Sequence, residues 1–498
     1  MFSPTGRPRT VDKDKNGDSG VARTISTSAA ASLVPSSKIV IVGSGCFGIS
    51  TALHLLRRGY TDVTVLDRAP VLPAVDAAST DINKIVRSSY GDMFYTRLAR
   101  EAIDAWKNRE EWGDNYHESG VLVLGSGMSI YADDAYKNDV AQGARVKRLV
   151  TSGVNLSDER VDVDSSVRSP DESIMLSELF HPEIPLGEKV KSAHAYLNVD
   201  GGWAFAEGGV RRAMQHVENL GGKILPAKDV SMLLKTELAD IKESPDRQKS
   251  RTKGVKCKDG SEYAADIVVL ATGSWTASAF PDLNLGEKCL ASGQSVAGIK
   301  LTPEEAERYR SSPVVLNFGS SGFYTFPPNK DNVVKVAKHT GGVSNFVPIP
   351  GAPTVDAVSA KVSTPRTVFS HGADGLKIPR SEALIIRDGL REVYPELAEK
   401  PFLYTRLCWY TDSPDSDWII DIHPDDSGLA LVTSGSGHGY KFLPVIGRLA
   451  ADRLEGKMAT EVQKKFAIDR PLRREDFLRD FSRLGVLNVD ELCGPDEL

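Results

Sequence analysis

The stretch Lys38-Ile-Val-Ile-Val-Gly-Ser-Gly-Cys-Phe-Gly48 decides the fold of this chain. Its apolar residues predict a strand that is buried on both faces, and three glycines spaced as GxGxxG follow that strand. Gly43 permits a tight turn, Gly45 lets the backbone approach a pyrophosphate, and Gly48 allows a helix to pack closely on the strand. The helix that begins at this loop offers free amide N–H groups to the phosphates.

A helix and a second strand follow the glycine loop in the order that a dinucleotide-binding unit requires. Apolar spacing places one face of the helix in the core, and Gly59 ends it. The strand over 63–67 ends in an acid, where a carboxylate accepts hydrogen bonds from ribose hydroxyls. We therefore predict a dinucleotide site rather than a glycine-rich structural turn. Besides the three glycines, its predicted members are Ser44, Cys46, Phe47, Asp67 and Arg68.

The glycine loop by itself does not distinguish FAD from NAD. Ala271-Thr-Gly-Ser-Trp275 closes a further apolar strand with a turn of small residues, as in FAD sites built from two segments. An ordinary strand-to-helix loop is the alternative interpretation of this segment. A second segment of this kind favours FAD.

The composition excludes several classes of protein. The chain has 498 residues, of which 41% are hydrophobic and 26% charged, as in a globular protein of two domains. A net charge of −6 with interspersed signs offers no surface for nucleic acid or an anionic membrane. No apolar run reaches the ~18 residues of a membrane span. The five cysteines form no CxxC pair, which predicts no metal site and a reducing compartment.

The ends of the chain carry few targeting signals. Residues 1–36 are rich in Ser, Thr, Ala, Gly and charge without apolar periodicity, so we expect a disordered extension. This segment has no h-region of a signal peptide. Arg7, Arg9 and Arg23 among Ser and Thr are compatible with a mitochondrial transit peptide, whereas three aspartates argue against one. The chain ends in Gly-Pro-Asp-Glu-Leu498 and not in an SKL-type signal. We expect a cytoplasmic protein and leave a peroxisomal location open.

The strand and loop signals divide the chain into two interleaved domains. Residues 37–122, 200–285 and 412–465 predict a discontinuous Rossmann-type FAD-binding domain of the α/β class. Residues 123–199 and 286–411 alternate strand signals with Pro- and Gly-rich loops. They predict an α+β substrate domain on a mostly antiparallel sheet. Residues 466–498 are predicted to form a C-terminal helical tail.

With these segments placed, the chain resembles the sarcosine oxidase and fructosyl-amine oxidase (amadoriase) branch of the FAD-dependent amine oxidases over residues 38–455. The resemblance is carried by four blocks, of which the last two together are highly specific. They are the glycine loop 43–48, Asn83-Lys-Ile-Val-Arg87, Cys408-Trp-Tyr-Thr-Asp-Ser-Pro-Asp415 continuing to 419–424, and Ser436-Gly-His-Gly-Tyr-Lys-Phe442. The family implies FAD as cofactor, a small-molecule amine and O₂ as substrates, and hydrogen peroxide as a product. We expect a monomer.

The resemblance assigns roles to the last two blocks. The family cysteine that matches Cys408 forms a thioether with the 8α-methyl carbon of the flavin by thiolate attack, whereas a buried structural cysteine is the alternative. Lys441 matches an active-site lysine near the substrate's acidic group or the flavin. The amides of Gly437 and Gly439 would face the pyrimidine side of the ring, where negative charge develops. His438 is either a ligand of that charge or a loop histidine with structural hydrogen bonds.

The resemblance also assigns roles upstream of these blocks. Lys335 resembles the lysine that activates oxygen, although a lysine on a strand more often points to solvent. His339, four residues on, matches an active-site histidine of sarcosine oxidases. Lys84 and Arg87 match a basic pair that faces the flavin or a substrate carboxylate, with a surface ion pair as the alternative. Tyr324 and Tyr410 match aromatic residues of the amine pocket, with core packing as the alternative.

One departure from the family concerns the substrate. Oxidases of Amadori products carry a pocket glutamate in a Phe-Glu-Pro block, whereas this chain reads Thr325-Phe-Pro-Pro-Asn329, with Phe326 at the place of the acid. We therefore expect another secondary amine, an N-alkyl amino acid or an N-methylated aromatic amine. The imine product would hydrolyse, or cyclise as in fungal-type specialised metabolism. A fructosyl amino acid oxidase, and a dehydrogenase with an acceptor other than oxygen, are the alternatives.

Overall fold

The computed structural model describes residues 33–125, 130–150, 173–191, 194–236, 250–317, 322–349, 361–471 and 484–498. Its first large sheet has six strands in the order β10-β2-β1-β14-β25-β24. All neighbours in this sheet are parallel except the edge pair β25 and β24. The strands are β1 (Lys38–Val42), β2 (Asp62–Leu66), β10 (Lys223–Leu225), β14 (Ile267–Leu270), β24 (Ile419–Ile422) and β25 (Leu429–Thr433).

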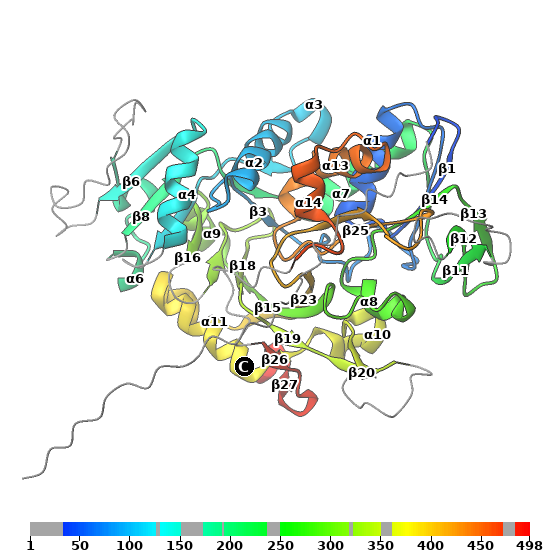
Figure 1. The fold of residues 1–498 in the computed structure, drawn as a ribbon. Coiled ribbons are helices and arrows are strands. Elements are labelled where there is room, and N and C mark those ends of the chain that lie inside the picture. Colours follow the sequence, from blue (N-terminus) through cyan, green and yellow to red (C-terminus); the bar gives the residue numbers. More distant parts are fainter. Residues whose placement is uncertain are drawn as a thin grey trace, which may run out of the picture.

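Both faces of this nucleotide sheet are covered, which explains the continuous apolar strands. Ile39 and Ile41 of β1 join one core with the helices on that side, and Val40 and Val42 join a second core on the other. The helices of the first side, grouped together in Figure 1, are α1 (Cys46–Arg57), α2 (Met93–Trp106), α7 (Ala206–Asn219), α13 (Ile446–Leu454) and α14 (Thr460–Phe466). The second side packs against the sheet β11 (Val230–Thr236), β12 (Arg251–Cys257) and β13 (Glu262–Ala264).

The second large sheet holds eleven strands among the described residues, and most of its pairs are antiparallel. Its longest pair joins β15 (Leu290–Lys300) to β23 (Phe402–Asp412). Helix α11 (Arg380–Val393) packs against this sheet in a core of its own (Figure 1). The other strands include β5 (Val121–Gly125), β8 (His194–Asn198), β16 (Val314–Asn317), β17 (Phe323–Thr325) and β18 (Val333–Lys338).

The predicted fold class is confirmed: an α/β nucleotide sheet accompanies a mostly antiparallel second sheet. The domain boundaries stay a prediction. Of the expected N-terminal extension 1–36, residues 1–32 lie outside the described residues. Within the described part of the chain, no helix combines the length and the apolar character that crossing a membrane requires.

The predicted helical tail needs a correction at its described end. Residues 484–498 form the short strands β26 (Gly485–Val486) and β27 (Leu492–Cys493) with 3-10 turns, and not an α-helix. Strand β27 pairs with Ile378 and Pro379, and this pairing buries Cys493. Because Gly494 and Pro495 follow at once, a helix cannot continue through this segment. Residues 472–483 of the predicted tail lie outside the described residues.

Helix α1, which begins at the glycine loop, crosses α13 at a glycine. A Cβ built on Gly447 would lie 1.9 Å from the carbonyl oxygen of Ser50. The buried Ser50 hydroxyl donates to the Leu443 carbonyl at 2.7 Å and accepts from the Gly447 N–H at 2.9 Å. The crossing therefore fixes the C-terminal loop and helix on the N-terminal nucleotide unit.

We predict that Gly447→Ala separates the two helices and lowers the free energy of unfolding by about 1–3 kcal/mol, the usual cost of overpacking. Urea denaturation measures this change. Gly286→Ala is the matched control, because a Cβ at Gly286 meets nothing within 4 Å. The control is expected to change stability by less than about 1 kcal/mol. Equal losses in the two variants would contradict the role of the crossing.

Candidate active site

Residues from both large sheets line a cavity of about 1000 Å³. Gly43 and Asp67 line it beside the nucleotide sheet, and Tyr324 and Tyr410 line it from the second sheet. All but four of the predicted site residues are among the lining residues. The four that are not are Ser44, Gly48, Lys335 and Cys408.

The glycine loop has the tight backbone geometry that the sequence predicts. Gly43 has φ 102°, and a Cβ there would lie 2.4 Å from the carbonyl oxygen of Ala271. A Cβ on Gly48 would lie 1.9 Å from the carbonyl oxygen of Gly43. Gly45 caps α1 without a side-chain acceptor, and the Cys46 N–H donates to the Ser79 hydroxyl, which leaves the following N–H groups of the first turn to face a phosphate. The loop thus fits a dinucleotide.

Asp67 orders this loop and also lines the cavity. Its carboxylate accepts hydrogen bonds from the Ser44 N–H at 2.8 Å and the Ser44 hydroxyl at 2.7 Å. Its other oxygen accepts from the Ala69 N–H at 2.9 Å. Ser44 therefore holds the Asp67 carboxylate in place and does not line the cavity itself. The carboxylate occupies the place expected for a residue that binds the ribose.

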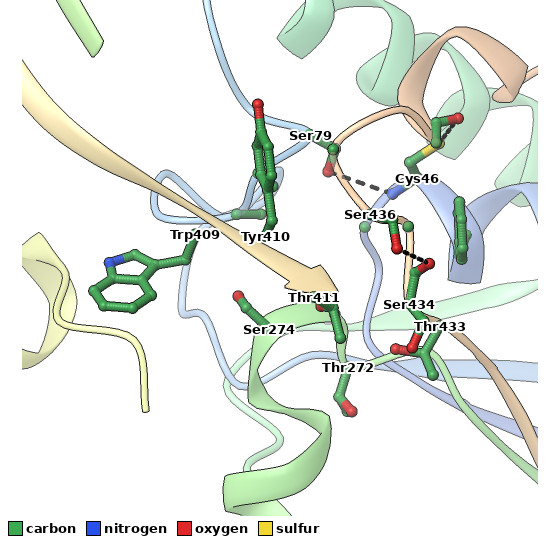
Figure 2. A pocket seen from close by; sticks show the side chains of 18 of the residues that line it. Cys46, Ser79, Thr272, Ser274, Trp409, Tyr410, Thr411, Thr433, Ser434 and Ser436 are labelled. Carbon is green, nitrogen blue, oxygen red and sulfur yellow. Dashed lines mark hydrogen bonds between the residues drawn. The ribbon is translucent and has the colours of Figure 1, made fainter. Parts of the chain in front are cut away.

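Hydroxyl side chains surround the middle of the cavity. Figure 2 shows that they come from several segments that lie far apart in the sequence. The Ser79 hydroxyl accepts a hydrogen bond from the Cys46 N–H at 3.3 Å. This ring of donors and acceptors suits the phosphate and polyol parts of a dinucleotide. Its members are Ser79, Thr272, Ser274, Thr411, Thr433, Ser434 and Ser436.

Three of the residues predicted to bind the cofactor, Cys46, Phe47 and Arg68, pack against or bond to other residues of the protein. Burial raises the pKa of the Cys46 thiol, so this cysteine is a neutral packing residue. The Phe47 ring fills space beside Gly439, where a Cβ would lie 2.6 Å from the ring. The Arg68 guanidinium bonds Asp76 at 2.7 Å and lies 4.0 Å from the centroid of the Trp275 ring.

Cys408 and two lysines meet around one buried carboxylate, Asp81. Lys84 Nζ lies 2.9 Å from an Asp81 oxygen and 3.6 Å from the Cys408 Sγ. Lys335 Nζ donates to the same Asp81 oxygen at 2.6 Å and to the Asn83 carbonyl at 2.7 Å. Lys335 and Cys408 are almost fully buried, at 0% and 1% exposure. The lysine on this strand therefore points into the protein.

The electrostatics of this cluster follow from burial and from Asp81. Burial opposes the charge on Asp81, but the ammonium groups of Lys335 and Lys84 hold its pKa well below its usual range. Burial lowers the pKa of Lys335 to about 8, although Asp81 acts in the opposite direction. Burial also disfavours the charge on Lys84, yet Asp81 keeps its pKa above the ordinary value. Lys84 is thus a stable cation beside the Cys408 sulfur.

A second group of buried basic side chains lies around Tyr90. The Arg87 guanidinium is 4.5 Å from the centroid of this ring, and Lys441 Nζ is 5.1 Å from it. Lys441 Nζ donates to the Tyr90 hydroxyl at 2.7 Å and to the His438 carbonyl at 3.0 Å. Burial and the charge of Arg87 lower the pKa of Lys441 well below its ordinary value.

The remaining predicted residues form an aromatic wall. Tyr324 and Phe326 meet edge to face with centroids 5.8 Å apart, and the His339 and Tyr410 rings lie 5.9 Å apart. Burial raises the pKa of Tyr324 to about 12, so its hydroxyl stays neutral. A Cβ on Gly437 would lie 2.4 Å from the Tyr410 ring, so this loop presses against the wall.

Sequence reasoning missed two groups that hold these residues in place. The first group is built on Asp81, which lies three residues before Lys84. An acidic residue so close to the basic pair was the signal in the sequence that could have revealed it. The second group is built on Asp139, a fully buried carboxylate that accepts from the hydroxyls of Ser88 and Ser89 at 2.6 and 2.9 Å. This anchor fixes the segment between Arg87 and Tyr90. No local pattern revealed it, because Asp139 is far away in the sequence.

The comparisons with known proteins agree with this geometry. Residues 38–453 match the model of a family described as FAD dependent oxidoreductase. L-Saccharopine oxidase of Schizosaccharomyces pombe is 30% identical over 428 residues, which cover 85% of this chain and 91% of the relative. N-methyl-L-tryptophan oxidase of Escherichia coli is 24% identical over 440 residues, with 84% and 95% covered.

The fold is also shared with solved structures. The fructosamine oxidase Amadoriase II of Aspergillus fumigatus superposes with a TM-score of 0.71 at 26% identity, covering 93% of this chain and 98% of that one. The predicted resemblance and the predicted enzyme class, an FAD-dependent amine oxidase that uses oxygen, are thereby confirmed. The chain belongs to the family of FAD dependent oxidoreductases.

Proposed function

We propose that this protein oxidises the secondary amine of an N-alkyl amino acid to an imine, with hydrogen peroxide as the second product. The observation that carries this proposal is the pair of buried basic side chains, Arg87 and Lys441, that line the cavity and both approach the ring of Tyr90. Among the described residues, no carboxylate forms an ion pair with Lys441. A substrate carboxylate supplies the negative charge that stabilises the Arg87 cation and favours the charged form of Lys441, whose pKa burial lowers.

The aromatic wall of the cavity suits an apolar nitrogen substituent. Tyr324, Phe326 and Tyr410 are each buried to more than nine-tenths and line the cavity. Aromatic rings contact an alkyl or aryl group over a large area and offer few polar groups to a sugar. Phe326 packs on Tyr324 and lies 4.9 Å from Lys335 Nζ, so an apolar ring stands at the place where we expected the family's acid.

The names of the relatives support an amino acid substrate. Two of them are named as oxidases of L-saccharopine and of N-methyl-L-tryptophan. An N-methylated aromatic amino acid fits both the cations and the aromatic wall, and its imine can close on a nearby ring. The Amadoriase structures favour the alternative, a fructosyl amino acid, whose carboxylate would use the same cations.

In this proposal some of the site residues bind the cofactor and others bind the amine substrate. FAD would supply the acceptor for the hydride, that is, for the hydrogen and both electrons of the C–H bond that breaks. The β1–α1 loop and the hydroxyl ring bind its phosphates and polyol, and Lys84 supports Cys408 as the point of covalent attachment. The amides of Gly437 and Gly439 stabilise negative charge on the ring, while Arg87 orients the carboxylate and Lys335 favours electron transfer to oxygen.

The substrate is tested with a panel of amines assayed for hydrogen peroxide. It contains sarcosine, pipecolate, N-methyltyrosine, saccharopine, fructosyl-lysine and fructosyl-valine. We expect the N-alkyl amino acids to be oxidised and the two fructosyl compounds to react at least about tenfold more slowly, a difference of about 1.4 kcal/mol in the barrier. Faster turnover of the fructosyl compounds would establish the alternative. Substrate-reduced protein that does not reoxidise rapidly in air would instead indicate a dehydrogenase.

The covalent attachment is tested by acid precipitation. We predict that the wild-type precipitate stays yellow, and that Cys408→Ser releases its FAD into the supernatant because a hydroxyl beside Lys84 is far less nucleophilic than a thiolate. Cys289→Ser is the matched control, since this cysteine is equally buried and contacts Ser434 instead. Free FAD from the wild-type protein would rule out the thioether and leave the dinucleotide site in place.

The proposed role of Lys335 in the reaction with oxygen depends on its positive charge, so it is tested by removing that charge. The pKa of about 8 means that the ammonium is present below pH 8 and is lost as the pH rises through 8. We predict that reoxidation of the reduced wild-type enzyme slows above pH 8. The Lys335→Met variant should be reoxidised about 100-fold more slowly than the wild type at pH 7, and its rate should not depend on pH. This factor is typical of the loss of one group that stabilises charge in a transition state. Lys338→Met, on the same strand but paired with Glu382, is the control. Stopped-flow absorbance measures the rates, and an unchanged variant would exclude Lys335.

A further inference from the structure

The helix α4 (Ile130–Ala141), cyan in Figure 1, holds the segment that follows Arg87. Its Asp139 carboxylate accepts hydrogen bonds from the hydroxyls of Ser88 and Ser89 at 2.6 and 2.9 Å. Asp139 and both serines are fully buried. Because a buried carboxylate is costly without such donors, the pairing fixes where these two residues lie.

Strand β8 (His194–Asn198) of the second large sheet holds the same carboxylate from another direction. The Tyr196 hydroxyl donates to Asp139 at 3.1 Å, and the Asn198 amide donates to it at 2.9 Å. The Asn198 amide also donates to the Ser88 hydroxyl oxygen at 2.9 Å. All four partners of Asp139 are donors, and a carboxylate can only accept. The network is therefore specific for an acid at this position.

Further side chains of α4 bind the backbone of the same segment. The Asn138 amide donates to the carbonyl oxygens of Tyr90 and Gly91 at 3.0 and 2.8 Å. The Tyr131 hydroxyl donates to the Ser89 carbonyl at 3.3 Å. Each residue from 88 to 91 thus has a hydrogen bond to this one helix.

The chain before Arg87 is also fixed. Strand β3 (Lys84–Val86) pairs with β9 (Gly202–Ala204), and Val86 lies opposite Gly202. Arg87 therefore lies between a strand ladder on one side and the bonds to α4 on the other. Its guanidinium lines the cavity, whereas Asp139 does not.

Helix α4 also contacts the aromatic wall of the site. Ala132, on its first turns, belongs to the same hydrophobic core as Tyr324, Phe326 and Tyr410. One helix thus packs with the residues proposed for the nitrogen substituent and bonds the segment that carries Arg87. This arrangement sets the distance between the carboxylate anchor and the aromatic wall.

We propose that Asp139 is a positioning residue that holds Arg87 in place for the carboxylate of the substrate. The inference rests on that part of the proposed function in which Arg87 binds a carboxylate. A guanidinium meets a carboxylate best through two parallel hydrogen bonds, so small displacements weaken the contact. A misplacement of about 1 Å costs roughly 100-fold in related cases. The anchor should therefore govern the affinity for carboxylates and the preference for an amino acid over a plain amine.

The first test measures binding without turnover. Phenylacetate has a carboxylate and an aromatic ring but no amine, and phenylacetamide is its neutral counterpart. Both are titrated into the flavin-loaded protein and followed by flavin absorbance. We expect Asp139→Asn to weaken phenylacetate about 10- to 100-fold, because the amide places a donor where the serine hydroxyls need an acceptor. Phenylacetamide should change by less than about twofold. Equal losses for the two ligands would overturn the inference.

A double-mutant cycle tests whether Asp139 acts through Arg87. In the Arg87→Gln background the carboxylate has already lost its guanidinium, so Asp139→Asn should weaken phenylacetate by less than about a further twofold. Two losses that multiply would show that Asp139 acts on the fold in general and would contradict the positioning role. A wild-type protein that binds phenylacetate no better than phenylacetamide would also contradict it.

Two variants guard against effects of misfolding. Asp426→Asn is the matched control, because this carboxylate is also buried and accepts from the N–H and the hydroxyl of Thr252, both at 2.7 Å, outside the cavity. It should keep the wild-type affinity for phenylacetate. The Ser88→Ala, Ser89→Ala double variant leaves Asp139 in place and removes the hydroxyls through which it acts. It should weaken phenylacetate as Asp139→Asn does, and an unchanged affinity would overturn the inference.

The second test uses turnover and separates this inference from the proposed function. N-methyltyrosine and N-methyltyramine differ only in the carboxylate. For Asp139→Asn we expect the KM of N-methyltyrosine to rise about tenfold or more, while kcat/KM of N-methyltyramine stays within about twofold. Equal losses would mark Asp139 as merely structural. If no N-alkyl amino acid is oxidised by the wild type, the proposed function fails, and the phenylacetate titrations still decide whether Asp139 positions a carboxylate site.

Discussion

The close approach of three backbone segments at the glycine loop is the constraint on which the rest of this structure depends. β1, α1 and β14 come so near that a side chain at Gly43 or Gly48 would overlap a carbonyl oxygen. The approach leaves the N-terminus of α1 facing the cavity, and the crossing at Gly447 then holds the C-terminal loop against it. Segments nearly 400 residues apart thereby form one wall of the site.

The second characteristic feature of the site is its group of buried basic side chains. Lys84 and Lys335 share Asp81, which lets both ammonium groups remain close together in a buried position. Arg87 and Lys441 surround Tyr90, and their environment consists mainly of aromatic rings and carbonyl groups. Asp81 keeps the pKa of Lys84 above its ordinary value and limits the lowering of the Lys335 pKa by burial. Among the described residues no carboxylate does the same for Lys441, and burial together with Arg87 lowers its pKa well below the ordinary value.

Much of the site could be predicted because its residues occur in short, specific blocks. Lys84 with Arg87, Tyr324 with Lys335, and Cys408 with Tyr410 were found by resemblance, and the structure brings them to one region. Local patterns could not reveal the supports of these residues. Asp139 reaches Ser88 from a helix about fifty positions away, and the role of Tyr90 depends on contacts with residues 438 and 441. Such partners are determined by tertiary packing, which leaves no repeating pattern in the sequence.

The sequence by itself determined the nucleotide unit, the presence of a second sheet and the family, because strand periodicity, glycine spacing and motif blocks are local properties of the chain. It misjudged the end of the chain, where pairing of β27 with a distant strand replaced the expected helix. Only the tertiary structure decided which lysines have a carboxylate partner and that Asp67 orders Ser44 in the glycine loop. These properties depend on burial and on distances between remote residues, and both exist only once the chain has folded.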